Sequence, residues 1–328
     1  MSSILVIQTA FLGDAILGTA VLEELRAQSP NAQIDYLVRK GHEALFEDHP
    51  FIRRLLVWDK KQDKYKNLFQ LLKTIRANRY DQVINLQRFA ATGFLTGFSG
   101  AKERIGFNKN PFSFLFSRVV KHDYNKHEVL RNLDLIKNNG SHSATSDPKP
   151  RLYPQSRHFD KVRHYTHQPY ITIAPASVWF TKQLPKVKWL ELLDTIYEEM
   201  QVIFIGGPGD KALAQEIIDA CDNPLLELVN LSGDLALLET AALMKGAMMN
   251  YTNDSGPLHI ASAMNAPTRA VFCSTVESFG FGPLSDDSRI LQTDLPLKCR
   301  PCGVHGQKSC PEGHFKCALS INMTADFS

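Results

Sequence analysis

The segment YTNDSGPLH, residues 251–259, combines residue types that could bind an anion. A strand-like run leads into it, and Pro257 fits the first turn of a helix, where a missing N–H costs nothing. The backbone amides of Ser255 and Gly256 would then point at a ligand above the helix N-terminus, which suits a diphosphate. The alternative is ordinary N-capping of this helix by Asp254 or Ser255.

Two further loops join a strand-like run to a helix-like segment. The loop APASVWFTKQLP, residues 174–185, holds Ser177 and Lys182. A lysine there could reach a phosphate as a mobile point charge, although a solvated surface lysine is the alternative. The second loop is Gly206-Gly207-Pro208-Gly209, which would let a helix N-terminus approach a ligand. Neither loop has the G-x-G-x-x-G or the P-loop pattern, which disfavours a dinucleotide dehydrogenase.

An acidic residue stands in the first strand–loop–helix connection, where a phosphate-binding loop would not place one. Gly13 and Asp14 lie between the strand-like run 4–7 and the helix-like segment 15–28. The local residues leave open what Asp14 does, and an N-cap or first-turn acid that the helix dipole favours is the ordinary interpretation. The chain has no Asp-x-Asp pair of the kind that holds Mg²⁺ on a nucleotide diphosphate. We therefore expect lysine and helix termini to neutralise a bound diphosphate, with no metal or cofactor.

Four cysteines cluster toward the end of the sequence, with the spacing C-x2-C-x7-C-x6-C: Cys299, Cys302, Cys310 and Cys317. Four thiolates could close a tetrahedron around a structural zinc ion. The spacing does not match a standard zinc finger, and a reduced, packed lobe is the interpretation we favour. Stable disulfides are not expected in a cytoplasmic chain.

The elements that position these residues alternate along the chain. Short apolar runs predict strands at 4–7, 33–38, 54–57, 82–86, 170–174, 202–205, 225–229, 248–251 and 268–272. Amphipathic segments predict helices at 15–28, 41–47, 65–78, 126–139, 186–200, 211–220, 235–245 and 255–264. This alternation is typical of α/β proteins with parallel, doubly wound sheets.

The Ser- and Pro-rich segment 141–156 interrupts the alternation and is typical of an interdomain linker. We therefore predict two Rossmann-like domains, residues 1–155 and 156–328, with ligands in a cleft at the carboxyl ends of their strands. A chain of 328 residues is long enough for both.

Charge is divided unevenly between the halves. Residues 1–158 hold 24 Lys and Arg against 15 Asp and Glu, whereas residues 159–328 hold 13 against 19. The first half could meet an anionic partner or an anionic membrane surface, although lysines scattered on solvated helices would give the same count. No tract resembles a nucleic-acid module. The sequence has no apolar run of membrane-spanning length and no signal peptide at its start, so we expect a cytoplasmic protein.

Taken together, these segments resemble glycosyltransferase family 9, the ADP-heptose:lipopolysaccharide heptosyltransferases. The resemblance rests on ILVIQTAFLGDAILGTAVLEELR, on K-x-L-P at 182–185, on VIFIGGPGD and on TNDSGPLHIASAM, in the expected order. The cysteine-rich end is most similar to the heptosyltransferase II branch. The resemblance implies a GT-B fold, in which the N-terminal domain binds the acceptor and the C-terminal domain binds the nucleotide sugar.

The same resemblance implies roles for individual residues. Asp14 would be the general base, Lys182 would stabilise the leaving ADP, and Asp254 would hold heptose hydroxyls. Ser255 and Gly256 would offer amides to the diphosphate. The remaining residues that the resemblance suggests are Ser177, Gly206, Glu239 and His259 for the donor, and Gly13, Arg88, Arg104 and Lys109 for the acceptor. Glu239 depends on the register of its helix, and Asn85 stands where many members have Asp.

The implied reaction is a metal-independent, inverting transfer of heptose from ADP-L-glycero-D-manno-heptose to the anionic Kdo- and heptose-bearing lipid A of lipopolysaccharide. Peripheral contact with the inner membrane is part of this expectation, and a nucleic-acid partner is not. One alternative is a family 9 transferase that uses another nucleotide sugar or acceptor. The other is a catalytically silent nucleotide-sugar-binding protein, which Asp14, Lys182 and Asp254 disfavour.

Overall fold

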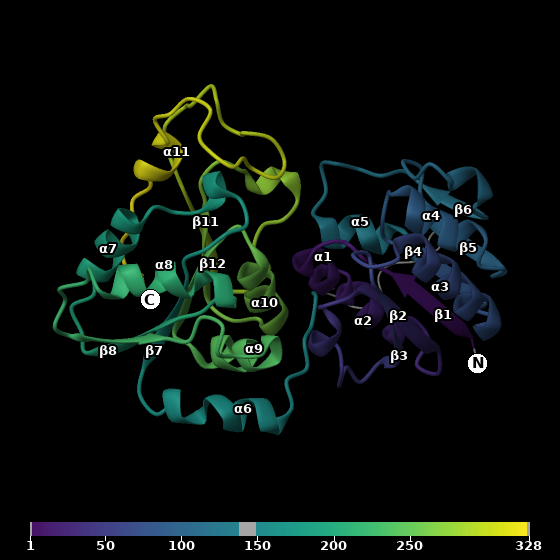
Figure 1. The fold of residues 1–328 in the computed structure, drawn as a ribbon, viewed down its shortest axis with the longest axis horizontal. Helices are drawn as coiled ribbons and strands as arrows, with labels where there is room; N and C mark the ends of the chain where they lie inside the picture. The colour runs from purple at the N-terminus through teal and green to yellow at the C-terminus, as the bar shows by residue number, and fades with distance from the viewer. Residues whose placement is uncertain (1, 138–148, 327–328) are drawn as a thin grey trace. The chain divides into compact units, whose positions relative to one another are not determined.

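The structure is a computed structural model that describes residues 2–137 and 149–326. The chain divides into two compact units, Met1–Tyr153 and Pro154–Ser328, called unit 1 and unit 2 below (Figure 1). Of the segment predicted as a linker, residues 141–148 lie outside the described part, and residues 149–155 are in neither a helix nor a strand. Each unit is built around its own sheet.

The sheet of unit 1 has six parallel strands in the order β3-β2-β1-β4-β5-β6. They are β1 Ser3–Ile7, β2 Gln33–Arg39, β3 Ile52–Trp58, β4 Gln82–Asn85, β5 Glu103–Phe107 and β6 Arg118–Val120. The order reverses between β1 and β4, and such switch points are where doubly wound sheets bind ligands, at the carboxyl ends of the strands.

Helices cover both faces of this sheet: α1 Leu12–Leu17, α2 Thr19–Gln28, α3 Lys64–Asn78, α4 Ala90–Gly97 and α5 Glu128–Asp134. Leu5 and Ile7 of β1 pack with apolar side chains of α3 and α4 on one face. Tyr36 of β2 lies on the other face, where its hydroxyl donates to the Ala15 carbonyl at 2.8 Å. Because side chains alternate along a strand, the apolar run 4–7 of β1 buries both faces of the strand.

Unit 2 repeats this topology, with the order β12-β11-β10-β7-β8-β9 and parallel pairing throughout. Its strands are β7 Tyr170–Ala174, β8 Met200–Phe204, β9 Leu226–Asn230, β10 Met249–Asn253, β11 Thr268–Phe272 and β12 Ser288–Gln292. The switch point lies between β7 and β10. Two doubly wound parallel sheets therefore confirm the predicted fold class.

The helices of unit 2 are α6 Ser156–Val162, α7 Lys186–Asp194, α8 Lys211–Ile218, α9 Leu237–Gly246, α10 Gly256–Met264 and α11 Lys316–Leu319. One face of the sheet packs against α7, α8 and the apolar residues of the segment 315–323. The helices α9 and α10 contact each other, and Leu258 of α10 packs on the opposite face with Ala270 and Phe272. Within residues 2–137 and 149–326, no helix is both long and apolar enough to cross a bilayer.

Three predicted helices are wrong in extent. The segment 15–28 forms two helices separated at Gly18, where Tyr36 approaches so closely that a Cβ would lie 2.5 Å from its hydroxyl. The segment 41–47 contains only a 3-10 turn, Glu43–Leu45, and Gly41 before it has a left-handed φ of 97°, outside helical geometry. The predicted helix 186–200 ends at Asp194, and Met200 already begins β8.

Several elements were missed, and one helix is shorter than predicted. The helix α5 covers only Glu128–Asp134 of the predicted 126–139, of which residues 138 and 139 lie outside the described part. The missed elements are α4, β5, β6, α6, β12 and α11. Most of them are short or carry glycine and charge, so their hydrophobic pattern is weak.

Candidate active site

The carboxyl edge of the unit 2 sheet brings Lys182 and Asp254 together. Lys182 ends the 3-10 turn Phe180–Lys182 that follows β7, and Asp254 directly follows the neighbouring strand β10. The Lys182 Nζ lies 2.7 Å from the Asp254 Oδ2. The Thr275 hydroxyl, beyond the end of β11, donates to the same oxygen at 2.7 Å. The switch point of this sheet therefore carries a mostly buried cation–carboxylate pair.

The N-terminus of α10 lies beside this ion pair, because the helix begins two residues after Asp254. Ser255 occupies the N-cap position, but its hydroxyl donates to the Asn253 carbonyl at 3.3 Å and makes no capping bond. The Asp254 carboxylate is engaged by Lys182 and Thr275. The structure therefore shows capping of α10 by neither the Asp254 nor the Ser255 side chain. Backbone amides in the first turn of α10 remain oriented for an anion.

Asn253 ties the loop that bears Lys182 to the end of β10. Its Nδ2 donates to the Pro175 carbonyl at 2.8 Å, and its Oδ1 accepts from the Leu184 amide at 3.0 Å. Asn253 is fully buried, so these bonds are shielded from water. No role was predicted for Asn253, although a polar residue at the end of a buried strand was a visible signal.

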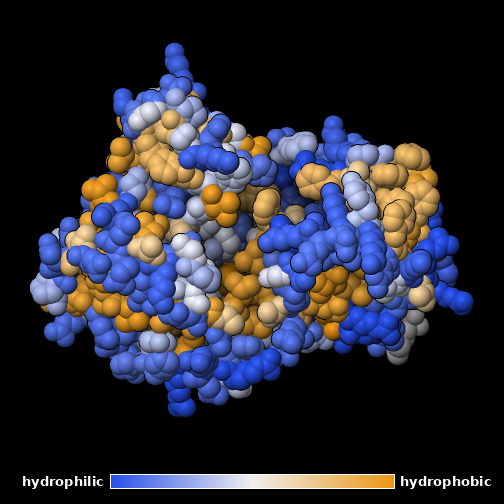
Figure 2. All heavy atoms as spheres, in the orientation of Figure 1, coloured by the Kyte–Doolittle hydropathy of each residue, from blue (hydrophilic) through white to orange (hydrophobic). Residues whose placement is uncertain are grey.

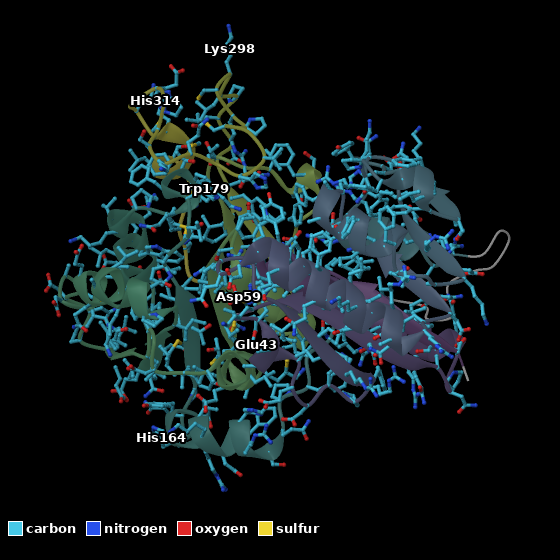
Figure 3. The ribbon with its side chains drawn as sticks, turned by 45° about the vertical axis from the view of Figure 1, so that its right-hand side comes forward. Glu43, Asp59, His164, Trp179, Lys298 and His314 are labelled. Atoms are coloured by element: carbon cyan, nitrogen blue, oxygen red, sulfur yellow. The ribbon has the colours of Figure 1, made fainter. Side chains whose placement is uncertain are left out.

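The cysteine-rich segment, defined as residues 299–317, packs on the same loop (Figure 3, where Trp179 marks the loop and His314 the segment). The Gln307 amide donates to the Thr181 hydroxyl at 2.7 Å. Gly306 comes so close that a Cβ there would lie 2.9 Å from the Lys182 Cγ. Thr181, next to the candidate phosphate ligand Lys182, is thus held in place by a segment more than 100 residues away in sequence.

Arg300, near the start of this segment, supports Thr275, which is the second partner of Asp254. Its Nε donates to the Cys273 carbonyl at 2.8 Å, and one terminal nitrogen donates to the Thr275 carbonyl at 2.8 Å. Charged guanidinium donors make the stronger class of hydrogen bond. Arg300 therefore fixes the backbone from which Thr275 contacts Asp254.

The four clustered cysteines are reduced. Within the described ranges, no group of three or more His, Cys, Asp or Glu residues is arranged to hold a metal ion. The Cys299 sulfur lies 4.0 Å from the His314 Nε2, and burial raises the pKa of the Cys317 thiol to about 11. Zinc binding by this cluster, the alternative that the sequence disfavoured, stays untested.

In unit 1, Asp14 stands in the first turn of α1, beyond the carboxyl end of β1 and at the switch point of the sheet. Its Oδ2 accepts from the Phe11 amide at 3.2 Å, and the side chain is half-buried. This bond is the one expected of a first-turn acid, and it also fixes the orientation of the carboxylate. The structure is thus compatible with both interpretations of Asp14.

A second acid, Glu128 of α5, lies near Asp14 because α5 contacts α1. Its Oε2 pairs with the Arg131 Nη1 at 3.0 Å, and both residues are buried. Burial, with a contribution from the negative charge of Asp14, raises the pKa of Glu128 to about 7. Glu128 was not predicted, since it lies more than 100 residues from Asp14 and no local pattern joins them.

The other donor candidates lie on loops that leave the sheet or start its helices. The Ser177 amide donates to the Gln183 Oε1 at 3.3 Å. A Cβ added at Gly206 would lie 2.7 Å from the Asp210 carboxylate, and this carboxylate already accepts from the Gly207 amide at 2.7 Å.

Glu239 and His259 each have a contact within unit 2. The Glu239 carboxylate accepts from the Ala236 amide at 2.8 Å, in the first turn of α9. His259 is buried in α10, and its ring lies 6.3 Å from that of Phe281. The role of each in donor binding stays a prediction.

The acceptor candidates fall at different ends of the unit 1 sheet. Arg88 and Lys109 follow the carboxyl ends of β4 and β5, and Arg88 donates to the Tyr124 hydroxyl at 2.9 Å. Gly13 lies beside Asp14 in α1. Arg104 pairs in register with Val83, toward the opposite end, and donates to the carbonyls of Ala101 and Leu115 at 2.6 and 2.9 Å. The structure thus separates Arg104 from the other three.

The sequence and the fold of the chain are similar to those of known proteins. The model of glycosyltransferase family 9 (heptosyltransferase) matches residues 68–312. Lipopolysaccharide heptosyltransferase 3 of Escherichia coli is 27% identical over 285 residues, which cover 82% of this chain and 83% of that protein. The solved structure of the E. coli ADP-heptose lps heptosyltransferase II covers 91% of this chain and 92% of its own, with a TM-score of 0.76 and 22% identity.

A further solved structure, E. coli heptosyltransferase WaaC with ADP-2-deoxy-2-fluoro heptose, has a TM-score of 0.69 and 18% identity and covers 89% of this chain and 93% of its own. These structures share the fold of the chain. Since the family model spans well over half of the sequence, the chain belongs to glycosyltransferase family 9, the heptosyltransferases, and is a glycosyltransferase.

Proposed function

We propose that the chain transfers a heptose from ADP-L-glycero-D-manno-heptose to the inner core of a lipid A-based acceptor. The ion pair between Lys182 and Asp254 at the carboxyl edge of the unit 2 sheet is the observation that carries the proposal. It supplies both a cation for a diphosphate and an acceptor for sugar hydroxyls. The name of the E. coli lipopolysaccharide relative and the ADP-heptose analogue in the WaaC structure support the choice of donor and acceptor.

Unit 2 binds the nucleotide sugar in this proposal. The Lys182 ammonium and the amides of Ser255 and Gly256 neutralise the diphosphate, while Asp254 accepts from heptose hydroxyls. Negative charge grows on the diphosphate as the glycosidic bond breaks, so donors already fixed in place stabilise the transition state more than the ground state. Asn253 and the cysteine-rich segment keep these donors in place.

Unit 1 binds the acceptor, and Asp14 is the general base. The acceptor hydroxyl oxygen attacks the anomeric carbon, the bond from that carbon to the phosphate oxygen breaks, and ADP leaves with the electron pair. Asp14 takes the hydroxyl proton, and the single displacement inverts the configuration. A carboxylate at a helix N-terminus stays ionised, as a base must. The basic character of the first half of the chain suits an anionic acceptor at a membrane surface.

The test is transfer from ADP-heptose to Kdo–lipid A and to the same acceptor bearing one heptose. Wild type and Asp14→Ala are assayed side by side, with chelator present. We expect product on one of the two acceptors, retained in chelator and reduced by at least about 10²-fold in Asp14→Ala. Unchanged turnover in Asp14→Ala would rule out Asp14 as the base. Binding of ADP without product on either acceptor would overturn the assigned substrates.

A further inference from the structure

Five phenylalanines form a chain of ring contacts at the surface of unit 1, and we call them the phenylalanine patch: Phe69, Phe94, Phe98, Phe112 and Phe114. Phe94 lies at the centre, with its ring 5.7 Å from that of Phe69, 5.0 Å from that of Phe98 and 6.2 Å from that of Phe112. Phe112 continues the chain to Phe114 at 6.2 Å. The contributing elements are α3, α4 and the connection between β5 and β6.

Much of this patch faces solvent. The exposed fractions of Phe69, Phe98 and Phe114 are 56%, 43% and 78%. In Figure 2, apolar side chains gather over the part of unit 1 where Figure 1 labels α4 and β6. Isolated exposed apolar residues need no explanation, but contiguous ones mark an interaction surface.

Packing and hydrogen bonds hold the phenylalanine patch in a defined arrangement. Phe94 packs against the apolar core beneath α3 and α4. The Asn110 side chain donates to the Phe89 carbonyl at 3.1 Å and accepts from the Phe112 amide at 2.9 Å, which clamps the β5–β6 connection onto the start of α4. At Gly97 a Cβ would lie 2.8 Å from Leu115, so this connection also packs on the end of α4. A preformed surface loses little conformational entropy on binding.

Basic side chains lie beside the patch, and the Arg76 guanidinium donates to the Phe98 carbonyl at 3.1 Å. Lys66, Lys73 and Arg76 are exposed and stand three residues before, four after and seven after Phe69 along α3, so they share its face. Residues 64–78 hold four Lys and Arg and no Asp or Glu. Residues 88–121, which supply the other four rings, hold six Lys and Arg and only one acid, Glu103. The partner of this surface must therefore accept aromatic rings and carry negative charge.

We propose that the phenylalanine patch docks unit 1 on an anionic lipid surface, with its rings in the headgroup region and its basic rim against lipid phosphates. Two such basic surfaces would repel each other, which disfavours a second copy of the chain. Phenylalanine has no polar group to read bases, and four of the five ring pairs are tilted or edge-on rather than stacked, which disfavours RNA. Exposed rings with basic neighbours are the combination that holds proteins at anionic interfaces.

The inference deepens the proposed function, because a lipid-anchored acceptor lies in such a surface. Its test is nevertheless independent of that function, since the vesicles contain neither donor nor acceptor. The full chain is sedimented with vesicles of phosphatidylcholine alone, or of phosphatidylcholine mixed with phosphatidylglycerol. We expect binding to the anionic vesicles only, weakened by added salt.

Two sets of substitutions test the surface itself. The double variant Phe69→Ser, Phe114→Ser should bind anionic vesicles at least about tenfold more weakly, because two exposed rings no longer enter the interface. Lys66→Gln and Lys73→Gln should each cost about fivefold. The matched controls in unit 2 are Tyr197→Ser, at an exposed aromatic with an exposed fraction of 82%, and Lys298→Gln, which projects into solvent (Figure 3). Both should bind as wild type does.

A fluorescence measurement separates insertion from mere attraction. In Phe114→Trp, emission should gain a component that brominated lipids quench, relative to wild type with its native Trp58, Trp179 and Trp189. Equal vesicle binding by wild type and the double serine variant would overturn the inference. The inference would also be overturned if wild type formed a dimer that the double serine variant did not form. It would equally be overturned if the double serine variant lost binding to single-stranded RNA but bound vesicles as wild type does. Failure of heptose transfer with vesicle binding preserved would overturn the proposed function and leave this inference standing.

Discussion

Lys182 and Asp254 lie 2.7 Å apart, with exposed side-chain fractions of 15% and 9%. The cation that the proposed mechanism assigns to the diphosphate is thus already engaged by a carboxylate from the next strand. Donor binding must exchange this carboxylate for phosphate oxygens, and Asp254 is then free to accept from sugar hydroxyls. The pair keeps a mostly buried lysine charge compensated until the donor arrives.

Substitution of the lysine tests this exchange. We expect Lys182→Ala to lower the rate of transfer by about 10²-fold or more, because a preorganised cation at the leaving group is lost. The affinity for ADP, measured by calorimetry, should fall as well. Lys186→Ala is the matched control, because Lys186 is exposed at the start of α7 only four residues away. If both variants behave alike, Lys182 has no specific role.

Substitution of the carboxylate should separate nucleotide from sugar. Asp254→Asn removes the charge that competes for Lys182, so we expect ADP to bind as well as to wild type or a few-fold more tightly. Transfer from the nucleotide sugar should nevertheless fall, since the neutral amide holds sugar hydroxyls less strongly. Calorimetry with ADP and a transfer assay on the same preparation provide the two measurements. A parallel loss of ADP affinity would show that Asp254 serves the nucleotide instead.

The two glycines of the cysteine-rich segment offer a matched pair of substitutions. Gly303 and Gly306 both have left-handed φ angles, 86° and 77°. Alanine at either position should cost about 1 kcal/mol of folding free energy from backbone strain. Only Gly306→Ala places a Cβ against Lys182 and Thr181, whereas nothing lies within 4 Å of a Cβ at Gly303. We expect similar losses in melting temperature but a selective loss of kcat in Gly306→Ala, and equal kcat values would contradict a role for the cysteine-rich segment in positioning Lys182.

Glu128 gives the stability of the protein a pH dependence with a defined sign. Burial raises its pKa from 4.5 to about 7. Between these values the folded protein keeps a proton that the unfolded chain has released, so rising pH destabilises the wild type. Glu128→Gln has no such proton to lose, and its melting temperature relative to wild type should rise across this window. Glu47→Gln, at an exposed position, should show no such trend.

The sequence predicted most strands of the two sheets because each contains a short, largely apolar run. The strand predictions for β1, β2, β7 and β11 agree with the structure to within one residue. The edge strand β6 has only three residues, and β5 contains Gly106 and two charged residues, so neither shows the apolar signal. Helix ends were less predictable, since they depend on tertiary contacts such as the approach of Tyr36 to Gly18.

The site was predictable where one short segment held its chemistry. Asp254, Ser255 and Gly256 stand in a row, and strand–loop–helix connections identified the loop of Lys182. The pairing of Lys182 with Asp254 requires β7 and β10 to be neighbours, which is a property of the sheet order. The support from Arg300 and the burial of Glu128 arise from long-range packing, and no spacing along the chain encodes either.

The cysteine-rich segment also sets an order of events during synthesis. Every strand of the unit 2 sheet leaves the ribosome before Cys299, so the sheet can pair before Gln307 reaches Thr181 and Arg300 reaches Thr275. A nascent chain stopped before Cys299 would lack the contacts of Gln307 and Arg300 beside the ion pair, and also the apolar residues of the segment 315–323 that cover one face of the sheet. The proposed donor site and the core beneath it are thus completed together, late in translation.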